Sequence, residues 1–200
     1  MDTIKCQNCG QEFEELVEFC SNCGEPMEGF SKPAGFWIRA GAYIIDIVVF
    51  IPIVILSIWN TYSLKSTTAL VLISLPGLIY KPCMESFFGA TLGKMSCKIK
   101  VIDNKGNKLS LFSAYVRFFP FLLSAGITLA GQLILFSSTE FQSAKTMMDM
   151  AEAQKSNYLG PIGSIIGILV IIECVFAAFT NRKRALHDML AESYCVHKEP

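Results

Sequence analysis

The sequence predicts an all-α membrane protein with four transmembrane helices and a small cysteine-rich head at its N-terminus. The 200 residues are 52% hydrophobic and 17% charged, with a mean hydropathy of +0.44, which is more apolar than an ordinary soluble domain. Four apolar stretches are each long enough to cross a hydrocarbon core, which takes about 20 residues of helix. Four of the eight cysteines fall within the first 23 residues. The chain therefore divides into a head and a membrane body.

The charged residues divide in the same way. Lys plus Arg and Asp plus Glu both number 17, yet residues 1–35 carry a net charge of −5 and the remaining 165 carry +5. Because apolar residues greatly outnumber charged ones, an intrinsically disordered chain is excluded, and no basic surplus favours nucleic acid. We therefore expect a head over residues 1–28, a linker over 29–35 and a membrane domain over 36–198.

Two pairs of cysteines in the head have the spacing of metal ligands. Each pair has the form Cys-x-x-Cys-Gly, and the candidate ligands are Cys6, Cys9, Cys20 and Cys23. The glycine permits a tight turn that points two thiolates at one place, and two such turns make a closed tetrahedral sulfur site. That donor set suits a structural Zn²⁺ and leaves no open position for catalysis. The alternatives are a pair of disulfides or a redox-active Cys-x-x-Cys.

A zinc-bound head fits both its size and its expected compartment. A segment this short buries too little apolar surface to fold unaided, so the metal would supply most of the folding free energy. No cleavable signal-peptide pattern precedes the cysteines, so we expect a reducing environment, where disulfides are rare. The head resembles the short N-terminal zinc ribbons of many prokaryotic membrane proteins. Because it is acidic and would repel phosphate, we expect it to dock a cytosolic protein and not nucleic acid.

The four predicted spans lie at about residues 36–59, 67–88, 118–136 and 159–179. The second contains Pro76 and Pro82, which remove backbone donors, so we expect a kinked helix that needs neighbours to satisfy the freed carbonyls. The fourth contains Gly163-x-x-x-Gly167, a small-residue face that permits close packing of helices.

Lysine and arginine residues near the ends of the spans indicate the orientation of the chain. Basic residues precede the first span, fill the connection between the second and third, and follow the fourth: Lys32, Arg39, Lys94, Lys98, Lys100, Lys105, Lys108, Arg117, Arg182, Lys183 and Arg184. The opposite side has Lys65, Lys145 and Lys155, diluted by acidic residues. By the positive-inside rule, we expect both termini to be cytoplasmic, in a prokaryotic cell (inner) membrane.

The connections between spans also have recognisable patterns. Residues 98–102 alternate polar and apolar side chains before the turn-forming Asp103-Asn-Lys-Gly106, which predicts a small hairpin at the membrane surface. Residues 137–157 place methionines among polar residues, which predicts a short amphipathic helix on the opposite side.

Ionisable side chains fall in or beside the spans, where charge is costly. Those that we take as candidates for a functional charge site are Arg39, Asp46, Glu85, Glu173 and Asp188. Arg39 and Asp46 share one face of the first helix but lie about 10 Å apart along its axis, too far for an ordinary salt bridge. In one interpretation, Arg39 reaches lipid phosphates and the aspartates hold helices together. In a second, Asp46, Glu173 and Glu85 line a polar path that exchanges a proton or a cation, while Arg39 keeps a carboxylate ionised. In a third, these residues recognise a lipid or a protein.

No motif supports enzymatic activity. Gly89-Ala-Thr-Leu-Gly93-Lys94 is similar to a phosphate-binding loop, but its glycine spacing is one residue short, and Met95 replaces the Ser or Thr that would bind Mg²⁺. Neither a GxSxG nucleophile elbow nor an HExxH pair occurs in the sequence. We therefore expect that the protein is not an enzyme.

Three blocks of sequence together resemble the RDD family of small integral membrane proteins. They are Gly35-Phe-Trp-Ile-Arg39-Ala-Gly-Ala-Tyr-Ile-Ile-Asp46, Glu85-Ser-Phe-Phe-Gly89-Ala-Thr-Leu-Gly93-Lys94 running into Lys100-Val-Ile-Asp103, and Arg184-Ala-Leu-His-Asp188-Met-Leu-Ala. The family's Arg, Asp and Asp map onto Arg39, Asp46 and Asp188. Glu192-Ser-Tyr-Cys-Val196 departs from the family's usual Gly-Thr and valine-rich ending. The resemblance implies a membrane domain associated with transport, since some members are reported to act as sodium/proton antiporters.

The sequence supports two functional hypotheses. The first is a small helical transporter with cation/proton exchange at Asp46, in which Arg39 and Asp188 are the charge partners. Because four helices enclose little room for a protected path, we expect a homo-oligomer. The second is a non-transporting membrane adaptor, whose zinc ribbon recruits a cytosolic protein while the charged side chains stabilise helix packing.

Overall fold

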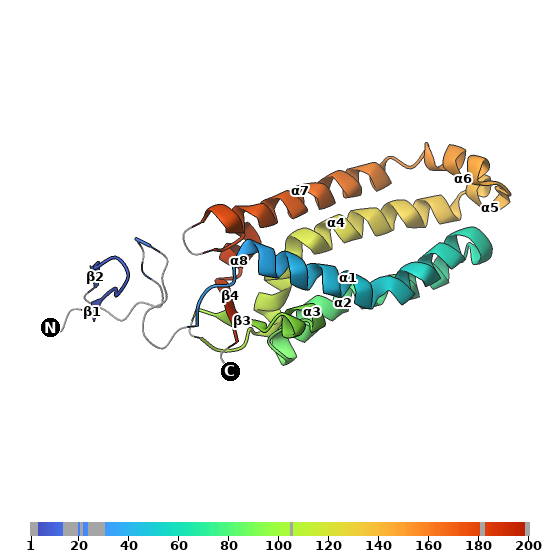
Figure 1. The fold of residues 1–200 in the computed structure, drawn as a ribbon. Coiled ribbons are helices and arrows are strands. Elements are labelled where there is room, and N and C mark those ends of the chain that lie inside the picture. The colour runs from blue at the N-terminus through green and yellow to red at the C-terminus, as the bar shows by residue number, and fades with distance from the viewer. Residues whose placement is uncertain are drawn as a thin grey trace. The chain divides into compact units, whose positions relative to one another are not determined.

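A computed structural model describes residues 4–13, 20, 22–23, 31–104, 106–180 and 183–198, except for the side chains of residues 173, 176 and 177. The described chain is mostly helical (Figure 1). It divides into two compact units. Unit 1 consists of Met1–Val48, Lys81–Phe118 and Ile172–Pro200, and unit 2 consists of Val49–Tyr80 and Phe119–Ile171.

Long apolar helices make up most of the described chain. They are α1 (Phe36–Trp59), α2 (Thr67–Phe87), α4 (Leu111–Ser137) and α7 (Leu159–Phe179). Within the described residues, three stretches are long and apolar enough to cross a membrane, namely Phe36–Leu64, Thr67–Phe87 and Leu111–Ser137. A fourth candidate is the pair Met147–Gln154 and Leu159–Ile172, which is bent by 81°. The described chain thus has three to four candidate membrane helices.

The helix boundaries differ most from prediction at α4. This helix begins at Leu111 and not near residue 118, because Ser110 caps it: the N–H of Ser113 donates to Ser110 Oγ (3.0 Å). The earlier start places Arg117 inside the helix instead of in a surface connection. α2 is continuous across Pro76 and Pro82, so the predicted distortion does not interrupt it.

Unit 1 contains a small antiparallel sheet that joins distant parts of the sequence. β3 (Ile99–Asp103) pairs with β4 (Ser193–His197), with Ile99 opposite His197 and Asp103 opposite Ser193. The sequence predicts a local hairpin at β3, and a bridge from Ile102 to Lys108 forms part of it. The full-length partner of β3 is nevertheless β4, whose first four residues are all buried. Long-range burial therefore decides the pairing of this strand.

The linker before α1 pairs with the outer side of β4. The contacts are a bridge from Pro33 to Val196, a hydrogen bond from the Ala34 N–H to the Cys195 carbonyl (2.8 Å), and one from the His197 N–H to the Lys32 carbonyl (2.9 Å). The chain that leaves the head is therefore fixed to the sheet before it enters α1.

Two five-residue helices pack on this sheet. α3 (Leu92–Ser96) contacts β3, and α8 (Leu186–Leu190) contacts β4. Thr91 caps α3, because its Oγ1 accepts a hydrogen bond from the Lys94 N–H (3.3 Å). At the start of α8, Asp188 Oδ2 accepts a hydrogen bond from the Ala185 N–H (3.3 Å). Polar side chains thus fix the start of each helix.

Unit 2 contains the α1–α2 and α4–α7 connections. A π-helical turn, η1 (Asn60–Leu64), ends at Lys65, whose Nζ donates to the carbonyls of Phe141 (2.9 Å) and Gln142 (3.4 Å). α5 (Thr139–Ser143) and α6 (Met147–Gln154) occupy the connection for which the sequence predicts a short amphipathic helix. Gly163 of α7 packs against α4, where an added Cβ would lie 2.3 Å from Thr128 Oγ1. The small-residue face is therefore a helix contact.

The described part of the head forms a short hairpin of β1 (Ile4–Lys5) and β2 (Glu12–Phe13). In the turn between them, the Cys6 N–H donates to the Gln11 carbonyl (2.8 Å), and the Gly10 N–H donates to the Cys6 carbonyl (2.9 Å). Gly10 has a φ of +75°, which glycine adopts without strain. The glycine of the second pair, Gly24, lies outside the described residues.

Candidate functional site

A fully buried carboxylate, Asp188, lies at the centre of the charged groups of unit 1. Its Oδ2 forms an ion pair with Arg39 Nη1, and its Oδ1 accepts hydrogen bonds from Arg117 Nε (2.9 Å) and Nη2 (2.6 Å). Arg39 also donates to the carbonyls of Ala34 (3.0 Å) and Lys183 (2.7 Å). This arginine therefore joins α1 to the linker and to the segment that carries α8.

Arg117 continues the chain of ion pairs to Glu85. Its Nη1 donates to Glu85 Oε2 (2.9 Å), and Lys94 Nζ lies 2.5 Å from Glu85 Oε1. Arg117, Glu85 and Lys94 are all buried. We call Arg39, Asp188, Arg117, Glu85 and Lys94 the buried ionic network. It takes one residue from each of α1, α8, α4, α2 and α3, so it connects helices that are far apart in the sequence.

The network holds these helices together because a buried charge without a partner is strongly destabilising. Removing one partner of a buried ion pair strands the other charge and costs about 3–5 kcal/mol. Burial acts to raise the pKa of Asp188, but the positive charges of Arg117 and Arg39 outweigh it and hold that pKa well below its usual range. His187 Nε2 lies 3.2 Å from Asp188 Oδ1 as well. Asp188 is therefore ionised throughout the physiological pH range.

Asp46 lies on α1 and contacts the start of α3. Thr91 Oγ1 donates to its Oδ2 (2.7 Å), and the N–H of Gly93 donates to its Oδ1 (2.8 Å). An added Cβ on Gly93 would lie 1.9 Å from the Ala42 carbonyl oxygen and 2.9 Å from Asp46 Cγ. Glycine at this position therefore lets α3 approach α1 closely enough for the hydrogen bonds to form.

The structure brings together three of the five predicted charge-site residues, which are Arg39, Asp188 and Glu85. It pairs Arg39 with Asp188, a choice that the sequence leaves open. Asp46 contacts α3 through Thr91 and Gly93. The side chain of Glu173 lies outside the described residues.

Sequence reasoning missed Arg117, Lys94 and Thr91, all of which contact a predicted site residue. Arg117 and Lys94 counted as charges of a surface connection. A helix-start signal was present for both: Ser110 precedes the apolar start of α4, and Thr91 precedes α3. With helices beginning there, Arg117 falls inside a span, where a lone charge requires a partner.

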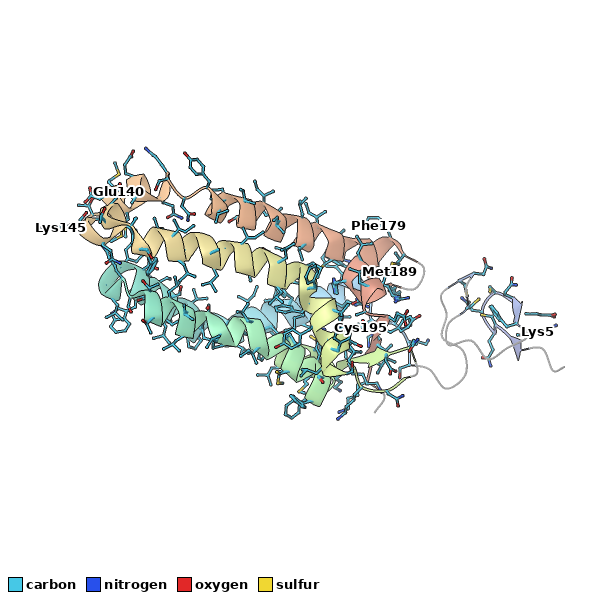
Figure 2. All side chains as sticks on the ribbon, turned by 180° about the vertical axis from the view of Figure 1, so that it is seen from behind. Lys5, Glu140, Lys145, Phe179, Met189 and Cys195 are labelled. Atoms are coloured by element: carbon cyan, nitrogen blue, oxygen red, sulfur yellow. The ribbon has the colours of Figure 1, made fainter. Side chains whose placement is uncertain are left out.

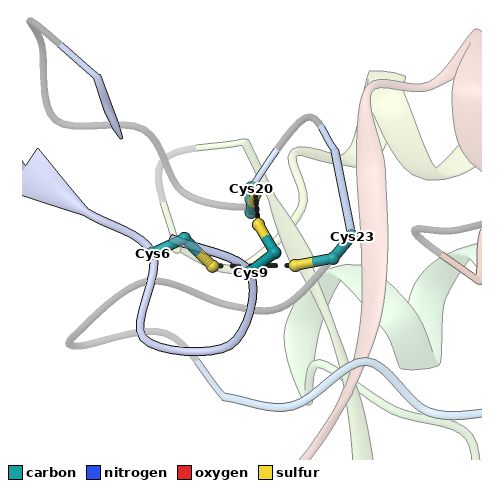
Figure 3. Close-up of side chains that lie close together, drawn as sticks. All are labelled: Cys6, Cys9, Cys20 and Cys23. Carbon is teal, nitrogen blue, oxygen red and sulfur yellow. Dashed lines mark hydrogen bonds between the residues drawn. The ribbon is translucent and has the colours of Figure 1, made fainter. Parts of the chain in front are cut away.

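The four predicted metal ligands lie together in the head, with their side chains pointing toward one another (Figure 3). Their Sγ atoms are all within 4.8 Å of one another, with 3.6 Å between Cys6 and Cys23 and 3.4 Å between Cys9 and Cys20. Four sulfurs around Zn²⁺, with bonds of about 2.3 Å, are about 3.8 Å apart. A disulfide bond is about 2.05 Å long, so these cysteines are not bonded in pairs. The cluster could hold a metal ion, and its dimensions are compatible with a zinc ribbon.

The surroundings of Cys9 favour the thiolate that metals bind. Hydrogen bonds from the Gln11 backbone and then from Cys20 lower the pKa of Cys9 to about 6. A thiolate is the form of cysteine that acts as a ligand, so the turn prepares this residue for coordination.

An open hollow of about 460 Å³ lies on the α5–α6 connection, where Figure 2 labels Glu140 and Lys145. Its lining residues are Glu140, Ser143, Ala144, Asp149, Glu152, Ala153 and Ser156. Asp149 Oδ2 accepts hydrogen bonds from the N–H groups of Thr146 (2.9 Å) and Lys145 (3.1 Å), which lower the pKa of Asp149. Asp149 caps α6, and Glu152 forms an ion pair with Lys155, so local contacts account for two of the three acidic residues of the hollow.

Comparison with known proteins identifies the family. The RDD family profile matches residues 33–192. The chain is 29% identical over 170 residues to the uncharacterized protein YckC of Bacillus subtilis (strain 168), covering 84% of this chain and 87% of that protein. It is 32% identical over 129 residues to the uncharacterized protein YxaI of the same organism, covering 52% of this chain and 85% of that protein. No solved structure matches. Since the matched region contains the whole buried ionic network and Asp46, the chain belongs to the RDD family of membrane proteins.

Proposed function

We propose that this RDD protein is a small transporter that exchanges protons for monovalent cations, with Asp46 as the exchange site. The observation that carries the proposal is the position of the Asp46 carboxylate. It is half-buried on an apolar helix and accepts hydrogen bonds from the Thr91 hydroxyl and the Gly93 N–H. Ionisable residues inside membrane spans mark the pathways of ions and protons in many membrane proteins.

A single carboxylate suits a one-for-one exchange. One proton or one monovalent cation bound to Asp46 adds the same single charge. Exchange of one for the other leaves the total charge constant, which avoids the cost of changing charge in a medium of low dielectric constant.

Thr91 suits both states of the exchange site as a positioning residue. Its hydroxyl donates to Asp46 Oδ2 at 2.7 Å. A hydroxyl rotates to suit its partner and also accepts a hydrogen bond, so the same oxygen can accept a hydrogen bond from the O–H of a protonated Asp46. Because Thr91 is fully buried and caps α3, this switch requires no movement of the backbone.

The proposal includes an arrangement in the membrane. We place four spans in a prokaryotic cell membrane with both termini in the cytoplasm, since basic residues gather in unit 1 at Lys32, Lys98, Lys108, Lys183 and Lys198. α7 is 21 residues long, which suffices for the fourth span. We propose a homo-oligomer without enzymatic activity and a structural Zn²⁺ held by Cys6, Cys9, Cys20 and Cys23. A bound Zn²⁺ would fold the head and would take no part in exchange.

Ion-driven proton movement in proteoliposomes tests the exchange site. A pH-sensitive dye inside the vesicles reports the response to added Na⁺, Li⁺ or K⁺. Wild-type protein should give a cation-dependent pH change, and Asp46→Asn should abolish it while the protein still inserts and elutes as a folded species. Glu140→Gln removes an exposed carboxylate of α5 and is the matched control, which should transport normally. Transport by Asp46→Asn at the wild-type rate would show that Asp46 is not the site.

A membrane adaptor is the second candidate, and the linker is the observation that favours it. Pro33 and Ala34 pair with β4, and Arg39 donates to the Ala34 carbonyl. The linker thus connects the head to the buried ionic network, and a protein bound to the head could act on that network through it. Deleting residues 1–28 separates the two functions. Transport that survives the deletion makes the head accessory, whereas a chain that transports nothing and loses a bound cytosolic protein with the head is an adaptor.

A further inference from the structure

The polarity of α8 is the reverse of that of a helix on a soluble protein. Its polar residues His187 and Asp188 are buried, while Leu186, Met189 and Leu190 are 47%, 44% and 64% exposed. A surface helix in water buries its apolar face and exposes its charges. In a membrane, by contrast, ionisable groups turn toward the protein interior and apolar side chains turn toward lipid. The exposure pattern of α8 is the membrane pattern.

α3 has the same reversed polarity. Gly93 and Lys94 are buried, and Leu92 and Met95 are 43% and 40% exposed. The two helices lie far apart in the sequence, and each turns its polar side toward the buried ionic network: Lys94 contacts Glu85 from α3, and Asp188 contacts the arginines from α8. Two separate helices therefore show the same reversed polarity beside the buried ionic network.

Both apolar faces continue the exposed surface of a membrane helix. Phe87 and Phe88, at the end of α2, are exposed immediately before α3, and Phe179, at the end of α7, is exposed before α8. Figure 2 labels Phe179 and Met189 on these two successive elements. The apolar surface that faces lipid along the spans thus extends onto the short helices.

Exposed lysines border the two apolar faces. Lys98 follows α3, and Lys183 precedes α8. Lys198 joins Lys98 through a hydrogen bond from its N–H to the Lys98 carbonyl (2.8 Å). Basic residues beside a membrane-embedded apolar face attract the phosphates of anionic lipids. The charges at the edge of this surface therefore complement an anionic leaflet.

We infer that α3 and α8 are embedded in an anionic lipid leaflet, with their apolar faces against acyl chains and with Lys98 and Lys183 at the lipid phosphates. The leaflet then forms the outer wall of the buried ionic network, and Asp188 and Glu85 lie below the boundary between lipid and water. This lipid surface does not depend on ion exchange at Asp46, so either can fail without the other.

Quenching of tryptophan fluorescence by brominated lipids tests the inference on the full-length protein in vesicles. Trp37→Phe and Trp59→Phe remove the native fluorophores. Leu190→Trp and Leu92→Trp then introduce one reporter each on α8 and α3, at exposed positions that tolerate a larger side chain. Asn104→Trp, in the exposed turn after β3, is the matched control. Each variant is reconstituted with a minority of either brominated phosphatidylglycerol or brominated phosphatidylcholine.

Both apolar-face reporters should be quenched, at least twofold more strongly by the anionic brominated lipid than by the zwitterionic one, and Asn104→Trp should not be quenched. Adding Lys98→Gln and Lys183→Gln should remove the preference for the anionic lipid while general quenching remains. Absence of quenching at both reporters would overturn the inference. Equal quenching by the two lipids would overturn its phosphate contacts. Quenching that is absent at high protein density and appears when the protein is diluted to one copy per vesicle would assign the face to a second copy of the chain instead.

Discussion

Arg39 and Asp188 lie 149 residues apart in the sequence, and their side chains form an ion pair in which the aspartate has no solvent exposure. The pair joins the beginning of the first membrane helix to a short helix near the end of the membrane domain. Arg117 binds the same carboxylate from α4. Two arginines from separate helices therefore share one aspartate, which couples the positions of those helices.

Replacing Arg117 should be among the most damaging changes to stability. Arg117→Gln leaves Asp188 and Glu85 each without one cationic partner, and the expected loss is about 3–5 kcal/mol of unfolding free energy. Thermal unfolding in detergent measures it. Lys155→Gln is the control, because Lys155 and Glu152 form a pair whose side chains are each 72% exposed, and it should change stability by less than about 0.5 kcal/mol. Similar unfolding temperatures for both variants would show that the network contributes little.

The lowered pKa of Asp188 fixes the direction of its pH effect. A carboxyl group whose pKa is lower when folded contributes stability at a pH above its unfolded value of about 3.9, and that contribution falls as the pH drops toward the folded value. The stability difference between wild type and Asp188→Asn should therefore stay constant from pH 8 to about pH 5 and shrink below about pH 4. Unfolding temperatures across this range measure it. A difference that disappears between pH 7 and pH 5 would contradict the assignment.

Gly93→Ala should separate α3 from Asp46. The added methyl group overlaps the Ala42 carbonyl oxygen at 1.9 Å, and relief of such overpacking typically costs about 1–3 kcal/mol. We expect lower thermal stability and loss of any activity that requires Asp46. Gly41→Ala is the control on α1, because an added Cβ there meets nothing within 4 Å. A Gly93→Ala protein as stable and active as Gly41→Ala would mean that the close contact is unnecessary.

Gly163→Ala should weaken the contact between α7 and α4. The new Cβ would lie 2.3 Å from Thr128 Oγ1 and 2.9 Å from the Thr128 backbone nitrogen. The two helices must therefore move apart, which should cost about 1–3 kcal/mol of stability. Gly126→Ala, on α4, has open space around the added carbon and should be neutral or slightly stabilising. The comparison of their unfolding temperatures measures the packing. Equal unfolding temperatures would show that the close contact at Gly163 does not contribute to stability.

Metal removal should unfold the head and leave the membrane domain intact. Protein purified without chelator should contain about one metal ion per chain, and Cys23→Ser should reduce that content because one of the four sulfurs is lost. Elemental analysis measures the metal and identifies it, and limited proteolysis within the first 28 residues reports the head. Unchanged metal content in Cys23→Ser would exclude the cysteine cluster as the binding site.

The sequence predicts some parts of this molecule well for physical reasons. Span 36–59 coincides with α1, since a long apolar run has few alternatives in a membrane. The cysteine cluster follows from spacing alone, because its ligands are close in the chain. Arg117 falls in a connection only when the start of α4 is placed near residue 118 instead of at Leu111. Its ion pairs with Asp188 and Glu85 could not be predicted because these partners come from other helices, about which periodicity along one segment contains no information. The pairing of β3 with β4 was missed for the same reason.

The pairing of β3 with β4 also determines when the protein can mature. β3 ends at Asp103, but its partner strand begins at Ser193, and Asp188 lies just before it. When the ribosome has synthesised α1, α2 and α4, it has not yet added Asp188, whose carboxylate pairs with Arg39 and Arg117. Until residues 188–197 emerge, two arginines and one strand edge remain without these partners inside an unfinished domain. A chain that ends before Asp188 therefore leaves Arg39 and Arg117 without this carboxylate and β3 without its partner strand, and unpaired charges are costly inside a membrane.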